Sequence, residues 1–210
     1  MGSYNQIAGR GLDRISALSD GVFAVAMTLI VLEIHVPSRA AVHSEQDLWL
    51  ALAALSPRAV TYLLSFLTLG IFWVGQQTQL DQLEHGDRNL AWLHVAFLAT
   101  VAVTPFSTEL LANFIVFRAA LLVYWGNFLL LGAAVYAAWA YATRAGLLKA
   151  DLHPGVSHAI RRRIIIAQLL YAFGAALCLI NTYWSIGFIV LIQLYYAFAP
   201  RIPVLTKILT

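Results

Sequence analysis

Several stretches of this sequence continue for about 20 residues with few charged side chains, the length a helix needs to cross the ~30 Å hydrocarbon core of a bilayer. Only 11% of the 210 residues are charged and 61% are hydrophobic, whereas charged residues make up about a quarter of ordinary soluble domains. A soluble chain of this length could not cover its surface with so few charges. We therefore predict an all-α, polytopic integral membrane protein.

Six of these stretches are long enough to be membrane-spanning helices, and turn sequences separate most of them. The turns are clearest at HVPSR, EHGDR and KADLHPGVSH, and the last two stretches meet in a tight hairpin near NTYWS. Ser44 is a suitable N-cap for a short interfacial helix over residues 44–55. No internal repeat divides the chain, so residues 1–210 are expected to form one transmembrane domain. The expected spans are residues 14–36, 58–83, 89–112, 115–143, 162–182 and 184–200.

The basic residues are shared unequally between the two ends of these six predicted helices. Ten of the 13 fall on the end that carries both termini, and three fall on the other end. Because Lys and Arg favour the cytoplasmic side, both termini are expected in the cytoplasm. The group of ten is Arg10, Arg14, Arg88, Arg144, Lys149, Arg161, Arg162, Arg163, Arg201 and Lys207, and the group of three is Arg39, Arg58 and Arg118.

The sequence lacks the side-chain groupings that an enzyme or a metal site needs. It contains no nucleophile with a nearby base, no phosphate-binding glycine loop and no His or Cys spacing typical of a metal site. The net charge of +3 is too small to suggest nucleic-acid binding, and topology explains the basic residues. We expect no enzymatic activity, no cofactor and no nucleic-acid partner, with membrane lipid around the chain.

The first apolar stretch, RISALSDGVFAVAMTLIVLEIHVP, contains charged residues among its apolar ones. On a helix that turns about 100° per residue, an aliphatic stripe with one threonine lies within about 60° of Val25, and Asp20 points nearly the opposite way. Two interpretations are open. In the first, the stripe faces lipid or another helix, and Asp20 is paired inside the bundle. In the second, the stripe lines a pore, and Asp20 fastens this helix to the next. Arg14 lies on a different face from Asp20 and either snorkels to the interface or reaches polar groups on adjacent helices. The stripe consists of Leu18, Val22, Val25, Thr28, Leu29, Leu32 and Val36.

The same stretch resembles a known family. The residues R-x-x-x-L-S-D-G-V-F-A-V-A-M-T-L-I-V-L-E-I closely resemble the first helix of the transmembrane protein 175 family, which comprises endolysosomal potassium channels and their prokaryotic homologues. The resemblance continues through FWVGQQTQLDQL and DRNLAWLHVAFLATVAVTPFSTELL and covers residues 14–111. It implies one six-helix unit per chain, assembly as a homotetramer and a place in the prokaryotic inner membrane.

The resemblance also implies a potassium-permeable pore lined by the first helix, without a carbonyl filter of the TVGYG type. The aliphatic positions that narrow the pore in the family correspond here to Val25, Leu29 and Leu32, with Thr28 beside them. Four copies of such a ring close a pore by steric contact or by dewetting. Since aliphatic groups give an ion no ligands, we expect modest selectivity for potassium over sodium, with the Thr28 hydroxyl as the nearest oxygen donor.

In the family, the arginine and the Ser-Asp pair of the first helix join a polar network with the second helix. The corresponding residues here are Arg14, Ser19, Asp20, Gln76 and Gln77. Relatives often have histidine where this chain has the two glutamines, which form hydrogen bonds but do not titrate near neutral pH. The alternative is that Gln76 and Gln77 bond to each other or face water near the helix end.

The sequence differs from the family at two further positions, and two alternative functions remain open. Leu18 replaces the phenylalanine of the family signature, and Val25 stands where many relatives have leucine or isoleucine, which should widen that ring. A secondary transporter would need interrupted helices, a midplane ion site and internal symmetry, and none is evident in the sequence. A non-conducting membrane scaffold predicts that the assembled protein passes no current.

Overall fold

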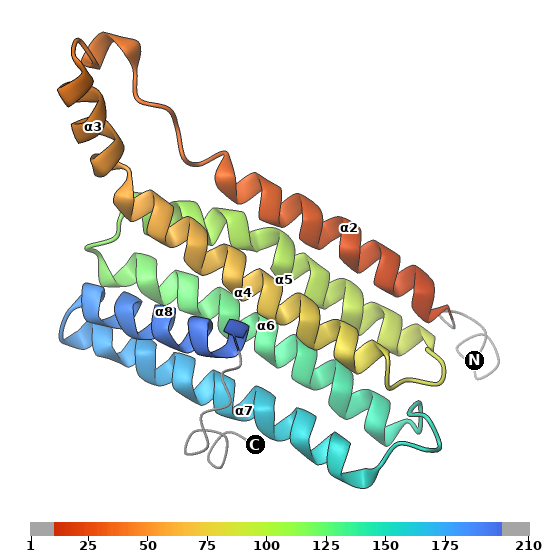
Figure 1. Cartoon of the computed structure of the whole chain (residues 1–210). Coiled ribbons are helices and arrows are strands. Elements are labelled where there is room, and N and C mark those ends of the chain that lie inside the picture. Colours follow the sequence, from red (N-terminus) through yellow and green to blue (C-terminus); the bar gives the residue numbers. More distant parts are fainter. Residues whose placement is uncertain (1–10, 199–210) are drawn as a thin grey trace.

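The computed structural model describes residues 11–198, and α-helices account for most of them. Six helices run alternately in opposite directions along one elongated bundle, and α3 projects from one end of it (Figure 1). Within the described part, the helical fold that we predicted is confirmed. The β-structure in this part is one isolated bridge, between Leu83 and Leu148 in two loops. The helices are α2 (Leu12–Val31), α3 (Glu45–Ala54), α4 (Ser56–Leu80), α5 (Arg88–Asn113), α6 (Arg118–Arg144), α7 (Pro154–Ala176) and α8 (Thr182–Phe198).

The lengths and composition of these helices make the chain a multi-pass membrane protein. Five helical segments within residues 11–198 are long and apolar enough to cross a bilayer: α2, α4, α5, α6 and the segment Gly155–Leu179 that contains α7. The sixth, α8, is apolar but has 17 residues, which correspond to about 25 Å of helix. Three of the basic residues used above to orient the chain, Arg10, Arg201 and Lys207, lie outside the described residues.

The start of the fifth helix and the end of the first differ from the predicted boundaries, each for a local reason. The fifth helix begins at Pro154 rather than near residue 162, because the His153 Nδ1 accepts from the Gly155 N–H at 3.1 Å and proline fits the first turn of a helix. The first helix ends at Val31 rather than near residue 36. Its last bonds are of the 3₁₀ type, and Pro37 disfavours helical backbone at Val36. Val36 therefore does not belong to the helical stripe.

The loops after α4 and α6 pair with each other at one end of the bundle. The Glu84 N–H donates to the Leu147 carbonyl at 2.9 Å, and the Lys149 N–H donates to the Gln82 carbonyl at 3.1 Å. Gly146, with φ of 69°, provides the left-handed residue that ends α6 before this pairing. As Figure 1 shows, α2 begins at the same end, so the basic residues of these loops lie together with the start of α2.

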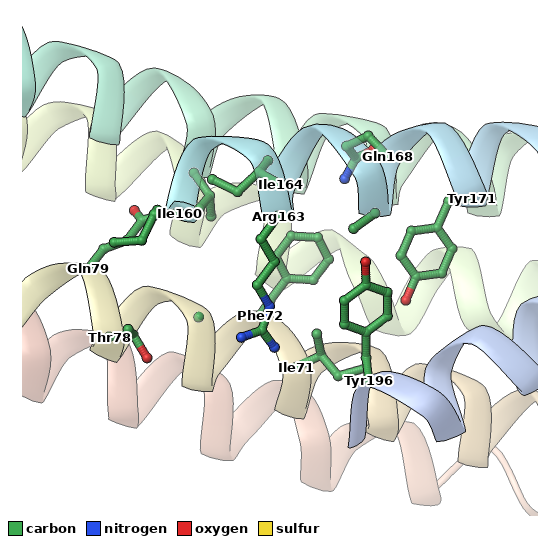
Figure 2. Close-up of a pocket in the computed structure, with 13 residues that line it drawn as sticks. Ile71, Phe72, Thr78, Gln79, Ile160, Arg163, Ile164, Gln168, Tyr171 and Tyr196 are labelled. Carbon is green, nitrogen blue, oxygen red and sulfur yellow. The ribbon is translucent and has the colours of Figure 1, made fainter. Parts of the chain in front are cut away.

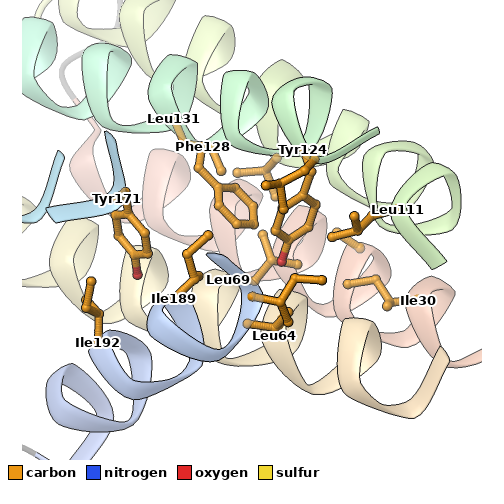
Figure 3. Packing of buried hydrophobic residues seen from close by; sticks show 14 of the residues in the cluster. Ile30, Leu64, Leu69, Leu111, Tyr124, Phe128, Leu131, Tyr171, Ile189 and Ile192 are labelled. Atoms are coloured by element: carbon orange, nitrogen blue, oxygen red, sulfur yellow. The ribbon is translucent and has the colours of Figure 1, made fainter. Parts of the chain in front are cut away.

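The main core lies between α4, α5, α6, α7 and α8, and the buried face of α2 packs against one side of it. Figure 3 shows Tyr124, Phe128 and Tyr171 among aliphatic side chains of the neighbouring helices. The Tyr124 and Phe128 rings meet edge to face with centroids 4.3 Å apart. By contrast, α2 lies at the periphery and packs chiefly against α4 and α5. One face of α2 is therefore left without a neighbour in the subunit.

Buried polar side chains also connect the helices of the core. The Thr108 hydroxyl donates to the Ser65 Oγ at 2.6 Å, and the Asn127 side-chain amide donates to the Thr104 hydroxyl at 2.9 Å. The Gln193 amide donates to the Thr68 hydroxyl and so joins α8 to α4. Such bonds between membrane helices contribute about 0.6 kcal/mol each on average. They fix the contacts between the helices within an otherwise apolar core.

Candidate pore-lining helix and its polar anchor

The two faces of α2 differ sharply in their surroundings. Ser19, Phe23, Ala26 and Ile30 are buried against α4 and α5, and the Phe23 ring lies 5.8 Å from that of Phe97. The stripe on the opposite face is exposed in the subunit. It consists of Leu18 (52% exposed), Val25 (57%), Thr28, Leu29 (45%) and the C-cap residue Leu32 (65%). Val22 is half-buried at its edge. The stripe is thus the unpartnered face of the first membrane helix.

Gln76 and Ser19 form the buried contact between α4 and α2. The Gln76 Nε2 donates to the Ser19 Oγ at 2.7 Å, and the Ser19 hydroxyl donates to the Ile15 carbonyl at 2.8 Å. Ser19 is 0% and Gln76 is 1% exposed. The Gln76 Oε1 has no hydrogen-bond partner, so this amide is only half satisfied. The position of Gln76 consequently depends on a single hydroxyl group of α2.

Asp20 is bonded to α4 through two further side chains. Its Oδ1 accepts from the Trp73 Nε1 at 2.7 Å and from the Gln77 Nε2 at 3.0 Å. The Gln77 Oε1 in turn accepts from the Ser16 hydroxyl at 3.0 Å. Gln76 and Gln77 therefore each bond to α2 and not to each other. We call the contacts of Ser16, Ser19, Asp20, Trp73, Gln76 and Gln77 the polar anchor.

Sequence reasoning missed Ser16 and Trp73 and included one residue that the anchor lacks. Ser16 is four residues before Asp20, and Trp73 is four residues before Gln77, so helical spacing was the signal for both. Arg14 is exposed, and its side chain forms no hydrogen bond or ion pair with any residue between 11 and 198. Its side chain extends instead past Gly11 at the start of α2.

Thr28 has the one hydroxyl group on the exposed stripe. Its Oγ1 donates toward the carbonyl oxygens of Ala24 and Val25, at 2.8 and 2.9 Å. Because the proton points to the helix backbone, the lone pairs of the oxygen are directed away from it. The stripe residues Leu18, Val22, Val25 and Leu29 form part of a shallow groove that small residues of α2 and Ala102 of α5 complete. Among the described residues, no three His, Cys, Asp or Glu side chains gather as a metal site.

Comparison with known proteins identifies the family. A family profile described as "Endosomal/lysosomal potassium channel TMEM175" matches residues 14–105. A potassium channel of Streptomyces collinus is 32% identical over 199 residues, which cover 92% of this chain and 95% of that protein. The chain belongs to the TMEM175 family.

Other members of the TMEM175 family extend this result. A potassium channel of Chamaesiphon minutus is 33% identical over 190 residues, which cover 88% of this chain and 92% of that protein. A crystal structure described as a lysosomal potassium-selective channel TMEM175 homologue from the same organism matches with a TM-score of 0.76 at 30% identity, over 90% of this chain and 98% of that one. The human endosomal/lysosomal proton channel TMEM175 is 31% identical over 102 residues, covering 46% of this chain and 20% of that protein. These relatives make this chain a member of an ion-channel family.

Proposed function

We propose that this chain is the subunit of a potassium-permeable channel with modest selectivity, and that α2 lines its pore. The observation that carries the proposal is the exposed aliphatic stripe of α2, which lies on a membrane helix of a channel-family protein and has no partner in the subunit. The opposite face of α2 is held by the polar anchor and the core. A helix fixed on one side and apolar on the other is suited to form part of a pore wall.

In this proposal, four copies of Val25, Leu29 and Leu32 surround the pore and close it. Aliphatic rings at this spacing exclude ions when they touch, or when the space between them is too narrow to stay wet. Opening requires a tilt or rotation of α2 that admits water between the four copies. Since α2 packs chiefly against α4 and α5, such a movement leaves most of the contacts within the core of α4 to α8 unchanged.

The Thr28 hydroxyl is the proposed source of the preference for potassium. Its lone pairs face away from the helix, because its proton is directed to the Ala24 and Val25 carbonyls. Four such oxygens replace part of the hydration shell of a cation in a pore that otherwise offers only aliphatic surface. A single ring of neutral oxygens gives weak discrimination, and hence a modest selectivity.

The homotetramer, the membrane and the orientation are parts of the same proposal. The groove between α2 and Ala102 is lined by small and aliphatic residues, which allow close approach of an α2 helix from a neighbouring copy. The basic residues at the end where α2 begins favour a cytoplasmic position for that end, and thus for both termini. The membrane is then the prokaryotic inner membrane, the sixth span is α8, and potassium is the permeating ion with no cofactor.

The test is potassium efflux from proteoliposomes that are loaded with potassium and diluted into sodium. Leu29→Ala should increase potassium flux by shortening the side chain that closes the pore. Leu122→Ala is the matched control, because Leu122 on α6 is exposed to a similar extent, 47% against 45% for Leu29. The control should conduct like the wild type.

The other outcomes of this experiment separate the rival functions. Equal flux in the wild type and Leu29→Ala would keep the channel but move its pore away from α2. Uptake that requires a sodium or proton gradient would support a secondary transporter. The absence of flux from folded, inserted protein would support a non-conducting scaffold. A pH-indicator dye trapped in the same vesicles distinguishes potassium from proton permeation, which is relevant because the human relative is called a proton channel.

A further inference from the structure

A cavity of about 110 Å³ lies between α4, α7 and α8, away from the stripe of α2 (Figure 2). Its walls are largely apolar, and Phe72 of α4 and Ile164 of α7 contribute to them. The polar side chains in its lining are Thr78, Gln79, Arg163, Gln168, Tyr171 and Tyr196. A space of this size holds a few methylene groups or a small ring, since apolar cavities of about 150 Å³ bind benzene. The cavity therefore accepts part of an apolar chain.

Arg163 stands at the boundary between the polar and the apolar part of α7. It is the last charged residue of the helix, and no charged residue follows it up to residue 198. Since residues 164–180 span about 25 Å as a helix, the guanidinium lies near the level of the lipid phosphates. Two further arginines, Arg161 and Arg162, directly precede it. This end of the cavity is strongly basic.

The Arg163 guanidinium has no carboxylate partner among residues 11–198. Its Cζ lies 5.7 Å from the centroid of the Tyr196 ring, so its contact in the subunit is with the face of an aromatic ring. A guanidinium in this position keeps N–H groups free to bind a second, anionic group, and its planar fork matches phosphate oxygens. The charge on this side of the cavity is thus complementary to an anion.

A second polar group in the cavity also lacks a partner. The Tyr171 side chain is 2% exposed, and its hydroxyl lies near the Gln193 side chain but completes no hydrogen bond with it. In Figure 2 its ring lies beside that of Tyr196 in the space between α7 and α8. A buried hydroxyl without a partner is costly, so a ligand atom that accepts its proton would remove the cost. The Gln168 Oε1 is likewise without a partner.

We propose that this cavity binds an anionic phospholipid of the surrounding bilayer. Arg163 binds the phosphate, the glycerol backbone lies against Phe72 and Ile164, and the Tyr171 hydroxyl donates to an ester oxygen where an acyl chain begins beside Ala167. Anionic lipids are attracted to basic pockets between membrane helices on the cytoplasmic side. The bound lipid joins α4 to the hairpin of α7 and α8. This site is independent of the pore proposed above.

The experiment measures binding of phosphatidylglycerol and phosphatidylcholine to the purified full-length chain by native mass spectrometry. Arg163→Gln should weaken phosphatidylglycerol binding by roughly tenfold, the effect of losing a charge-assisted hydrogen bond. Arg162→Gln is the matched control, since it removes the same charge from the neighbouring position, which does not line the cavity. Its affinity should change by less than about twofold. Wild-type binding of phosphatidylcholine should be at least several-fold weaker.

A second variant tests the acyl-chain part of the site separately. Ala167→Leu places a larger side chain in the cavity wall and keeps every charge, so it should also weaken phosphatidylglycerol binding. Soluble glycerol 3-phosphate should fail to compete, because it has no chain. Equal losses in Arg163→Gln and Arg162→Gln, equal affinity for both lipids, or full affinity in Ala167→Leu would each overturn the proposed site.

Discussion

The buried hydrogen bond between Ser19 and Gln76 makes a quantitative prediction about how α2 is held. Ser19→Ala removes the acceptor of the Gln76 Nε2, and the Gln76 Oε1 already has no partner. The variant therefore leaves a whole side-chain amide unpaired at a position that is 1% exposed. An unsatisfied buried group costs about 1–3 kcal/mol, and bonds between membrane helices reach at most about 1.7 kcal/mol. We expect Ser19→Ala to lower the free energy of unfolding by about 1–2 kcal/mol.

Gln76→Met then provides the decisive comparison. Methionine has a similar length and no hydrogen-bonding requirement, so in the Ser19→Ala background it removes the unpaired amide. The double variant should be more stable than Ser19→Ala alone, and the cycle should give a coupling of about 1 kcal/mol. Reversible unfolding in mixed micelles with increasing dodecyl sulfate, followed by tryptophan fluorescence, measures each free energy.

Thr78→Ala is the control for loss of a hydroxyl group. Thr78 is exposed on α4, and its hydroxyl bonds only to the Val74 carbonyl within the same helix. This variant should change the free energy of unfolding by less than about 0.5 kcal/mol. If Ser19→Ala is no more destabilising than Thr78→Ala, or if the effects of Ser19→Ala and Gln76→Met simply add, the bond does not hold α2 as we describe.

Three further changes test other parts of the structure. Val25→Leu should lower single-channel conductance, because four larger side chains narrow the proposed ring; an equal or larger current would argue against a barrier there. Thr28→Val removes the proposed oxygen ligands and should shift the reversal potential between potassium and sodium solutions, whereas an unchanged potential would exclude the hydroxyl. Gly174→Val should destabilise the protein by about 1–3 kcal/mol in thermal unfolding, because a Cβ at Gly174 would lie 3.0 Å from Ile189 and from Phe188; a melting temperature equal to that of the wild type would refute this packing.

Hydropathy predicted the approximate position of the apolar helices, five of which within residues 11–198 are long enough to cross a bilayer. It did not predict where the helices end, since Pro154 and His153 start α7 through local hydrogen bonding that composition does not reveal. The predicted end of the first helix also differs from the observed one for a local reason, because the last turn of α2, which ends at Val31, changes to 3₁₀ bonding before Pro37. Element boundaries depend on a few backbone groups, and average hydrophobicity does not detect them.

The site was predicted less completely than the fold. Helical periodicity separated the aliphatic stripe from Asp20, because both features depend only on the geometry of one helix. The partners of Asp20 come from α4, and nothing in the sequence gives the relative rotation of two helices. For this reason Arg14 was assigned to a network from which the described structure separates it, whereas Trp73, four residues before Gln77, could have been found from helical spacing. The cavity beside Arg163 depends on three helices and was not predictable from the chain alone.

The peripheral position of α2 has a consequence for how such proteins diversify. Residues on its exposed stripe contribute little to the folding of the subunit, whereas the core from α4 to α8 forms without them. Selection therefore acts on substitutions in the stripe mainly through their effect on the assembled protein, and only weakly through their effect on folding of the chain. Relatives can therefore differ at these positions without compensating changes in the core of the subunit.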